Sequence, residues 1–489
     1  MKREFVLNII LLVFINLLIK PLFIFGIDLG VQNRLGDQYG LYFALLNLTY
    51  LTQIINDFGI QSFNNRHISQ HPHLLPKYFP NLLAIKAILS ITYVLLTFLI
   101  AWLGLGYGAA ALPLLLVLLL NQVLVQLILF LRSNISGLGY YRLDSLLSAL
   151  DKFLMLITCG AILWGEVTEL TLMSFAWAQT LALLTTAIVV FVLLSQVSML
   201  PARPSWSKNW RAGKPALLML FRQSMPYALV VLLMFAYTRL DAVLLERMAG
   251  EGQADVYAGA FRLLEACNMF GFLFASLLLP MFARLIKQKA KVRPLVSLSL
   301  KLIWAGSLSL STAIFFCRED LLKWMMPLRA TSDRFDVLGV LIWAFVPVSV
   351  TYIFSTLLTA RERMMRMNRY FLIGIAIDLG LNLFLIPPYG ALGAAIAALT
   401  TQVFISISMV RLAFKEFGFS ATTKSMVRLG GFAAFVVVSG YLVGKMMVLH
   451  WGGRFGFMLV AGVFGYVAFG LINLKELKRQ IFSGQSALS

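Results

Sequence analysis

Charged residues are scarce in this chain of 489 residues. Only 13% are Asp, Glu, Lys or Arg, against about 25% in an average soluble domain. So few charges do not cover the surface of a water-soluble protein, which excludes a soluble enzyme, a soluble nucleic-acid-binding protein and a disordered chain. Hydrophobic residues make up 60% of the sequence instead, and the mean hydropathy is +0.85. This composition is typical of a membrane protein with many spans.

Acidic residues and cysteines are also few. The 21 Asp and Glu stand against 41 Lys and Arg, and cytoplasmic loops of membrane proteins collect this kind of basic excess, so we predict no nucleic-acid partner. The three cysteines lie in or beside apolar runs, where we expect packing residues rather than disulfides. No P-loop, His-Glu-x-x-His motif or nucleophile elbow occurs. We therefore expect a protein that is not an enzyme, with no cofactor and no certain metal site.

Long apolar runs dominate the sequence. A membrane-crossing helix needs roughly 20 mostly apolar residues. The candidate stretches lie at about 5–26, 40–60, 80–104, 109–131, 145–164, 171–194, 224–245, 255–283, 295–317, 337–360, 369–387, 391–411, 426–448 and 455–474. Their continuous apolar length favours helices over barrel strands. The sequence predicts an all-α polytopic membrane protein with about fourteen transmembrane helices.

The distribution of Lys and Arg predicts the orientation. Most of them fall in segments that are cytoplasmic if the N-terminus is cytoplasmic, so we expect both termini in the cytoplasm. The longest predicted inner loop is rich in proline and basic residues. We predict an N-terminal six-helix bundle at 1–195, a cytoplasmic linker at 196–222 and a C-terminal six-helix bundle at 223–415. Helices thirteen and fourteen and a cytoplasmic tail follow at 416–489.

The second bundle repeats features of the first. An Asp-x5-Arg pattern ends the first helix of each half, at Asp28 and at Asp241. In the following helix, Asn47 aligns with Glu265. An even number of helices per repeat gives two parallel, pseudo-symmetric repeats, and substrate paths of such transporters run between the halves.

Several runs of residues resemble one family of transporters. YAGAFRLLE at 257–265, leading into FASLLLP at 274–280, resembles the eighth helix of the multidrug/oligosaccharidyl-lipid/polysaccharide (MOP) exporter superfamily. NLFLIPPYG at 382–390 with GAA at 393–395 resembles the Pro-x-Gly-x-x-Gly-Ala-Ala turn between helices eleven and twelve of that superfamily. Residues 39–59 resemble the second helix of O-antigen-type flippases.

The resemblance implies a function and a location. Such a flippase moves an undecaprenyl-diphosphate-linked oligosaccharide, for example an O-antigen or capsule unit, from the inner to the outer leaflet of the bacterial cytoplasmic membrane by alternating access. Its partners are the lipid-linked glycan, membrane lipids and, as a further expectation, other polysaccharide assembly proteins. Fourteen spans resemble the polysaccharide and lipid II flippases more than the multidrug branch, which usually has twelve.

Basic residues inside the spans are candidate ligands for a diphosphate. Arginine and lysine hold phosphate oxygens with charge-assisted hydrogen bonds, and a charge at bilayer depth needs a partner or a watery cavity. By resemblance, Arg262 corresponds to a cavity arginine of the lipid II flippases; the alternative is a structural pair with Glu265 at i,i+3. Lys20 is either a phosphate ligand or the partner of a carboxylate. The predicted cavity residues are Arg262, Lys20, Glu265, Asn47 and Arg239.

Carboxylates inside the spans are candidates for coupling to Na⁺ or H⁺. By resemblance, Asp241 matches a position from which lipid II flippases supply a sodium ligand. Asp378 and Asn382 are four residues apart, hence on one helix face, and carboxylate and amide oxygens suit a hard cation. The alternatives are a polar pair that packs helices together and proton coupling through Asp378 or Glu265.

Two further charged residues are expected to have no role in transport. Asp57 lies near the inner end of the second predicted span, where a solvated helix-end carboxylate is the simplest interpretation. Lys86 lies near the inner end of the third, from where a lysine can extend to the interface.

Two rival functions remain open. A cation-coupled exporter of drugs or other small molecules from the same superfamily would favour acidic and aromatic cavity residues, whereas basic residues occur in spans of both halves here. A membrane glycan polymerase or ligase typically carries a large outer loop, and the predicted outer loops are short.

Overall fold

The computed structural model is helical throughout the residues that it describes, which are 19, 21–61, 64, 68, 73, 75–165, 167–198, 214–420, 422–445 and 450–471. No β-strand occurs among them, which confirms the predicted all-α class. A helix satisfies its backbone hydrogen bonds within one segment, so long apolar runs fold as helices in a membrane. Most of the predicted span 5–26, including Lys20, and most of the predicted linker 196–222 lie outside the described residues.

The helices follow one another through short connections. Up to residue 287 they are α2 Leu29–Leu35, α3 Gln38–Thr52, α4 Ile54–Asp57, α6 Leu75–Leu99, α7 Leu112–Gly137, α8 Tyr141–Leu147, α9 Leu150–Leu163, α10 Leu172–Ser198, α11 Lys214–Ala249 and α12 Glu251–Lys287. From residue 293 they are α13 Arg293–Phe316, α14 Arg318–Met325, α15 Ser332–Leu341, α16 Phe345–Ala360, α17 Met364–Phe417, α18 Thr423–Gly444 and α19 Trp451–Ala468. Helices α7 and α13 each carry a proline in the first turn, where its missing N–H leaves no helical bond unmade.

The chain divides into two compact units. Unit 1 comprises Met1–Gly259 with Ile375–Ala394, and unit 2 comprises Ala260–Gly374 with Ala395–Ser489. Unit 1 therefore combines the predicted N-terminal bundle with parts of α11, α12 and α17. The domain boundaries predicted from the sequence stay predictions, since they follow the repeat rather than the packing.

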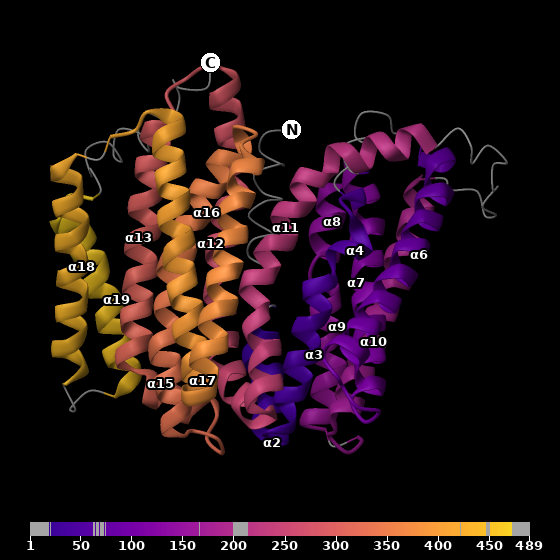
Figure 1. Cartoon of the computed structure of the whole chain (residues 1–489), viewed down its shortest axis with the longest axis horizontal. Coiled ribbons are helices and arrows are strands. Elements are labelled where there is room, and N and C mark those ends of the chain that lie inside the picture. The colour runs from indigo at the N-terminus through magenta and orange to yellow at the C-terminus, as the bar shows by residue number, and fades with distance from the viewer. Residues whose placement is uncertain are drawn as a thin grey trace. The chain divides into compact units, whose positions relative to one another are not determined.

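In unit 1, polar side chains join neighbouring apolar helices. Helix α10 packs on α7 and α9, and α3 packs on α11 (Figure 1). Thr180 of α10 donates to Oδ1 of Asn121 on α7 at 2.6 Å, and Asn121 donates to the carbonyl of Ala176 at 3.1 Å. Such interhelical hydrogen bonds add specificity where lipid provides no hydrophobic drive for helix association.

The start of α12 and the end of α11 are fixed to the N-terminal bundle within unit 1. Gln32 donates to the carboxylate of Asp255 at 2.7 Å, and the Tyr107 hydroxyl donates to Glu246 Oε2 at 2.6 Å. Burial raises the pKa of Tyr107, and the adjacent Glu246 carboxylate raises it further, so the phenol remains a donor. These contacts explain why 223–259 belongs to unit 1.

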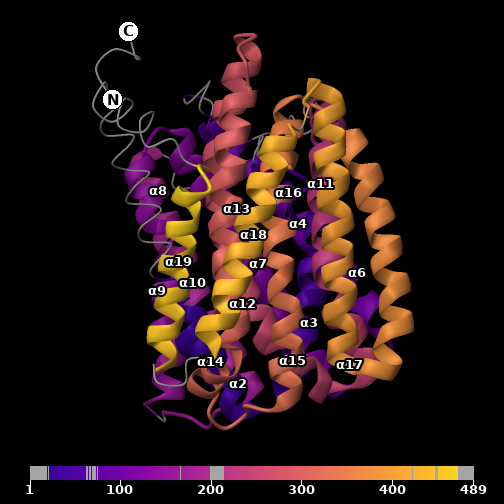
Figure 2. The same cartoon turned by 90° about the vertical axis from the view of Figure 1, so that its left-hand side faces the viewer.

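Unit 2 is packed through small residues. Helix α13 contacts α16, α18 and α19, and α18 contacts α19 (Figure 2). A Cβ at Gly462 of α19 would lie 2.2 Å from Ser309 Oγ of α13, so only glycine permits this approach. The packing is of the kind that close small-residue contacts produce in membrane helices.

Helix α17 is a hairpin of two arms. A straight helix of 54 residues would be about 80 Å long, yet Arg363 before its start lies 2.9 Å from Glu416 at its end. The chain reverses at Gly390, whose φ of 53° favours glycine, directly after Pro387 and Pro388. The turn predicted between 369–387 and 391–411 is confirmed.

Ten helices in the described part of the chain are long and apolar enough to cross a membrane. One of them, α17, contains two of the predicted spans because it reverses at Gly390. The predicted span 40–60 is divided between α3 and α4, the predicted span 224–245 lies in the charged α11, and 5–26 is mostly outside the described residues. Ten helices thus agree with a fold of about fourteen spans.

Candidate functional site

A cluster of four buried polar residues lies in unit 1, and we call it the Asp241 cluster. It consists of Asp241 on α11, Tyr257 on α12, and Asp378 and Asn382 on the first arm of α17. Asn382 Nδ2 donates to Asp241 Oδ1 at 2.6 Å and to the Asp378 carbonyl at 2.9 Å. The Tyr257 hydroxyl donates to Asp241 Oδ2 at 3.3 Å. The structure thus brings together all three residues that the sequence assigned to ion coupling.

The chemistry of this cluster is that of an anionic site with few cations of its own. Asp241 is 2% exposed, and among the described residues it makes no ion pair, only hydrogen bonds with neutral donors and with the Asp378 carboxyl. Two carboxyl groups in hydrogen-bonding contact cannot both be ionised unless a proton or another cation lies between them. The buried Oδ1 of Asn382 has no hydrogen-bond partner in the described structure.

The donors of the Asp241 cluster fit a hard cation. Carboxylate and amide oxygens are the ligands that Na⁺ or a proton-carrying water would use, whereas a transition metal prefers nitrogen and sulfur. No group of three or more His, Cys, Asp or Glu side chains suited to a metal occurs in the described ranges. Sequence reasoning missed Tyr257, although the repeat aligns it with Tyr39; both tyrosines are buried.

Two predicted cavity residues also meet in unit 1. Arg239 Nη1 on α11 donates to Asn47 Oδ1 on α3 at 3.1 Å, and its guanidinium lies 4.9 Å from the ring centroid of Tyr50. Tyr50 in turn stacks on Phe235 of α11 at 6.4 Å. The Arg239 side chain is only partly buried, whereas Asn47 is 1% exposed. The guanidinium is therefore held by a cation–π contact and one hydrogen bond, with part of it accessible.

Arg262 forms the structural pair that its spacing allowed. Its Nη1 lies 2.9 Å from Glu265 Oε2, one turn along α12 in unit 2. The Arg262 side chain is 6% exposed and that of Glu265 26%. Pairing and a cavity role are compatible, so the cavity role stays a prediction. Lys20, the remaining predicted ligand, lies outside the described residues.

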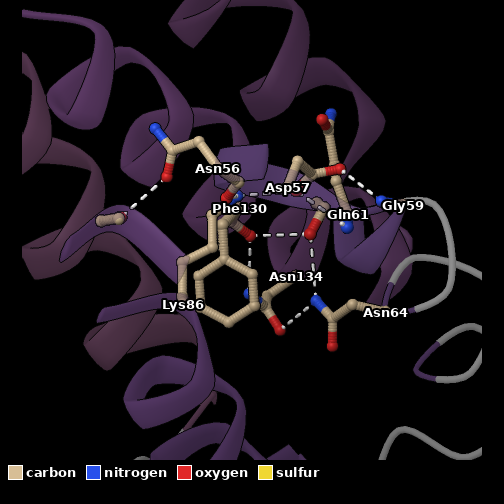
Figure 3. Close-up of polar contacts among 10 residues, drawn as sticks. Asn56, Asp57, Gly59, Gln61, Asn64, Lys86, Phe130 and Asn134 are labelled. Carbon is tan, nitrogen blue, oxygen red and sulfur yellow. Dashed lines mark hydrogen bonds and ion pairs between the residues drawn. The ribbon is translucent and has the colours of Figure 1, made fainter. Parts of the chain in front are cut away.

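Asp57 and Lys86 form a buried ion pair, which corrects the expectation for both (Figure 3). Lys86 Nζ on α6 lies 2.6 Å from Asp57 Oδ1 at the end of α4, and it also donates to the Asn56 carbonyl at 3.1 Å. Lys86 is 2% exposed, so it does not extend to the interface. Asp57 also accepts the backbone N–H of Gly59, where the chain turns sharply after α4.

An amide network adjoins this pair (Figure 3). Asn64 Nδ2 donates to Asn134 Oδ1 at 2.8 Å and to Ser133 Oγ at 2.9 Å on α7. Asn134 donates to the carbonyl of Phe130 one turn earlier. The charges and amides at this end of unit 1 therefore satisfy one another across three segments, which identifies a structural junction.

Comparison with known proteins identifies the family. Residues 6–286, more than half of the chain, match the model of the family described as polysaccharide biosynthesis protein. The chain belongs to this family. A search of curated proteins found no match.

Solved structures share the fold of this family member at low sequence identity. The lipid II flippase MurJ in an inward closed conformation is 13% identical, covers 98% of this chain and 99% of its own, and superposes with a TM-score of 0.68. A multidrug resistance MATE family transporter in an inward-facing conformation is 14% identical, covers 81% of this chain and 94% of its own, with a TM-score of 0.65. A MOP superfamily transporter from Pyrococcus furiosus is 12% identical and covers 84% and 95%, with a TM-score of 0.59.

The family and the fold establish the class of protein. The chain is a multi-pass membrane protein of the MOP exporter fold, related to the lipid II flippases, and it is a flippase or transporter. Proteins of this class are generally not enzymes. The resemblance seen in the sequence is confirmed at this level.

Proposed function

We propose that this family member flips a lipid-linked oligosaccharide, carried on undecaprenyl diphosphate, from the inner to the outer leaflet of the bacterial cytoplasmic membrane. The observation that carries the proposal is the extent of the similarity. The lipid II flippase MurJ covers 98% of the chain, whereas the MATE transporter covers 81%. A family match to polysaccharide biosynthesis proteins supports a glycan as the cargo.

The cargo requires basic residues at bilayer depth, because its diphosphate does not cross hydrocarbon unaided. We assign the diphosphate contacts to Arg239, held by Asn47 and Tyr50, and to Arg262, held by Glu265. Arginine is suited to this role since its planar fork can bind two phosphate oxygens at once. Lys20 stays a third proposed ligand.

Energy coupling is assigned to the Asp241 cluster. A Na⁺ ion or a proton bound by Asp241, Asp378 and Asn382 would supply the positive charge that two neighbouring carboxyl groups require. Because these residues lie on α11 and α17 of unit 1, binding a cation would draw the two helices together, and releasing it would let them part. A cation gradient could then bias alternating access.

A cation-coupled exporter of small molecules is the second candidate. The Asp241 cluster favours it, since a carboxylate site serves cation coupling with any cargo, and the fold also matches a MATE transporter with a TM-score of 0.65. The two candidates differ in cargo, and therefore in whether an anionic headgroup or a cationic compound competes for the protein.

Proteoliposomes distinguish the two functions. A short prenyl diphosphate carrying a labelled disaccharide is placed in both leaflets, and the label in the outer leaflet is destroyed by a membrane-impermeant reagent. A flippase makes the protected label accessible with time, whereas a cationic dye in the same vesicles is not moved. Transport of the dye without movement of the disaccharide lipid would establish the exporter instead.

A further inference from the structure

An arginine fork lies at the end of the α17 hairpin in unit 2, and none of the sites above includes it. It consists of Arg363 before the first arm, Arg366 in the first turn and Glu416 at the end of the second arm. Arg363 Nε donates to Glu416 Oε2 at 2.9 Å, and Arg366 Nη1 pairs with Glu416 Oε1. Each carboxylate oxygen thus holds one guanidinium.

The exposure of the three side chains is unequal. The Glu416 side chain is only 7% exposed, whereas those of Arg363 and Arg366 are 41% and 52% exposed. The carboxylate is therefore buried beneath the two guanidinium groups, which reach the surface. Burying a carboxylate is costly unless it is paired on both oxygens, so the pairing fixes the positions of both arginines.

The fork is left with unused donors and positive charge. An arginine has five N–H donors, and within the described ranges Arg363 and Arg366 make no further side-chain hydrogen bond or ion pair. Two guanidinium groups against one carboxylate leave a net charge of +1. Without Glu416 the two arginines would repel each other; with it, their outer edges are held side by side, an arrangement that suits the oxygens of one phosphate group.

The surface beside the fork is apolar. Met365, Leu372 and Ile373, one to two turns along the same arm of α17, are 63%, 52% and 49% exposed. Their spacing of seven and eight residues places them on one helix face. The membrane-spanning stretch begins at Met364, so the fork lies at the edge of a surface that faces acyl chains.

We propose that the arginine fork binds the phosphate headgroup of a membrane lipid whose acyl or prenyl chain lies along this face of α17. The lipid phosphate would bridge Arg363 and Arg366 from the side opposite Glu416. The proposal goes beyond the flippase function and does not depend on it. It differs from general attraction by basic loops because it requires a buried carboxylate to arrange the arginines.

The first test keeps all charges and removes the fork geometry. In the double variant Arg363→Lys with Arg366→Lys, Glu416 remains paired, so the fold is preserved. We expect its affinity for farnesyl diphosphate, measured on the detergent-purified full chain, to fall about tenfold or more, because lysine lacks the two-donor edge. The matched control is Arg369→Lys with Arg411→Lys, two exposed arginines at the same end of the hairpin, which should bind as the wild type does.

The second test uses the sign of a charge change. Glu416→Gln makes the site more positive, so attraction by net charge alone would strengthen binding. Our proposal expects weaker binding, because the arginines lose the carboxylate that arranges them. Equal losses in the two lysine pairs, or tighter binding by Glu416→Gln, would overturn the proposal.

The choice of probe separates a lipid from a free phosphate. Inorganic pyrophosphate should bind at least about tenfold more weakly than farnesyl diphosphate if the apolar face of α17 contributes. Equal affinity for both would contradict a lipid site. In phosphatidylcholine nanodiscs doped with phosphatidylglycerol, retention of the latter that depends on the fork identifies bulk phospholipid as an occupant, and retention of farnesyl diphosphate alone identifies the prenyl lipid.

Discussion

Two buried carboxylates of unit 1 are neutralised in opposite ways. Asp57 lies 2.6 Å from the ammonium group of Lys86, and the backbone N–H of Gly59 also donates to it. Asp241 receives hydrogen bonds from the amide of Asn382 and the phenol of Tyr257, and makes no ion pair with a described residue. The first carboxylate has its counter-charge built in, whereas the second has only dipoles around it.

The difference separates structure from function. An ion pair that is complete within the protein fixes two segments and gains nothing from a solute, since its charges already cancel. A buried carboxylate stabilised only by dipoles and by a second carboxyl group gains most when a cation arrives from outside. We therefore interpret Asp57 with Lys86 as a junction and the Asp241 cluster as the coupling site.

The largest effect on stability is expected at the junction. Lys86→Met leaves the carboxylate of Asp57 without its counter-charge, which should lower the free energy of unfolding by about 3–5 kcal/mol. Thermal unfolding in detergent measures this, and Asp57→Asn in the same chain should restore part of the loss. Lys301→Met, at a partly exposed lysine without an ion pair in the described residues, is the control. Equal melting of both single variants would contradict the interpretation of a buried pair.

The Asp241 cluster should behave in the reverse manner. Asp241→Asn removes a charge that lacks a counter-charge, so the stability without added cation should be unchanged or higher. Wild-type protein should gain up to about 2.7 kcal/mol at a cation concentration of 100 Kd, and the variant should gain almost nothing. Melting curves with Na⁺ at constant pH, and at several pH values without Na⁺, identify the cation. The exposed Asp333→Asn should retain the wild-type gain; a gain that survives in Asp241→Asn would remove the site from the account.

Arg262 lies between these extremes because its partner Glu265 is partly exposed. Arg262→Ala should cost about 2 kcal/mol through loss of one charged hydrogen bond, and the protein should still insert and fold. The proposed cavity role predicts that this variant leaves the labelled disaccharide lipid in its original leaflet. Wild-type movement by the folded variant would show that the arginine is structural only.

Tyr257 should give the smallest effect. Tyr257→Phe removes one hydrogen bond of 3.3 Å to Asp241 and keeps the ring, so the cation affinity should change by only about twofold to tenfold. The stability without cation should change by about 1 kcal/mol or less. A loss of cation binding as complete as that in Asp241→Asn would make Tyr257 an essential ligand rather than a supporting donor.

Much of the fold follows from local features of the sequence. Apolar length predicts the spans, and the Pro388-x-Gly390 pattern predicts the reversal of α17, because proline and a left-handed residue end a helix locally. The spacing of Asp378 and Asn382 likewise places both on one face. These inferences depend only on helix geometry.

The contacts between distant segments could not be predicted in the same way. Asp57 and Lys86 are 29 residues apart, and each alone is typical of a helix end; their pairing depends on how α4 packs against α6. The same holds for Arg363, Arg366 and Glu416, which in the sequence are ordinary residues of inner loops. Asp241 was found only through the family resemblance, since Asp-x5-Arg by itself specifies no partner.

The most direct test measures movement of the disaccharide-linked prenyl diphosphate in proteoliposomes under an imposed cation gradient, with wild-type protein and Asp241→Asn side by side. The account predicts that a Na⁺ or pH gradient accelerates movement by the wild type and that the variant, although folded, loses this response. Movement of the lipid by the variant with an unchanged response to both gradients would contradict the central claim that the Asp241 cluster couples a cation to flipping.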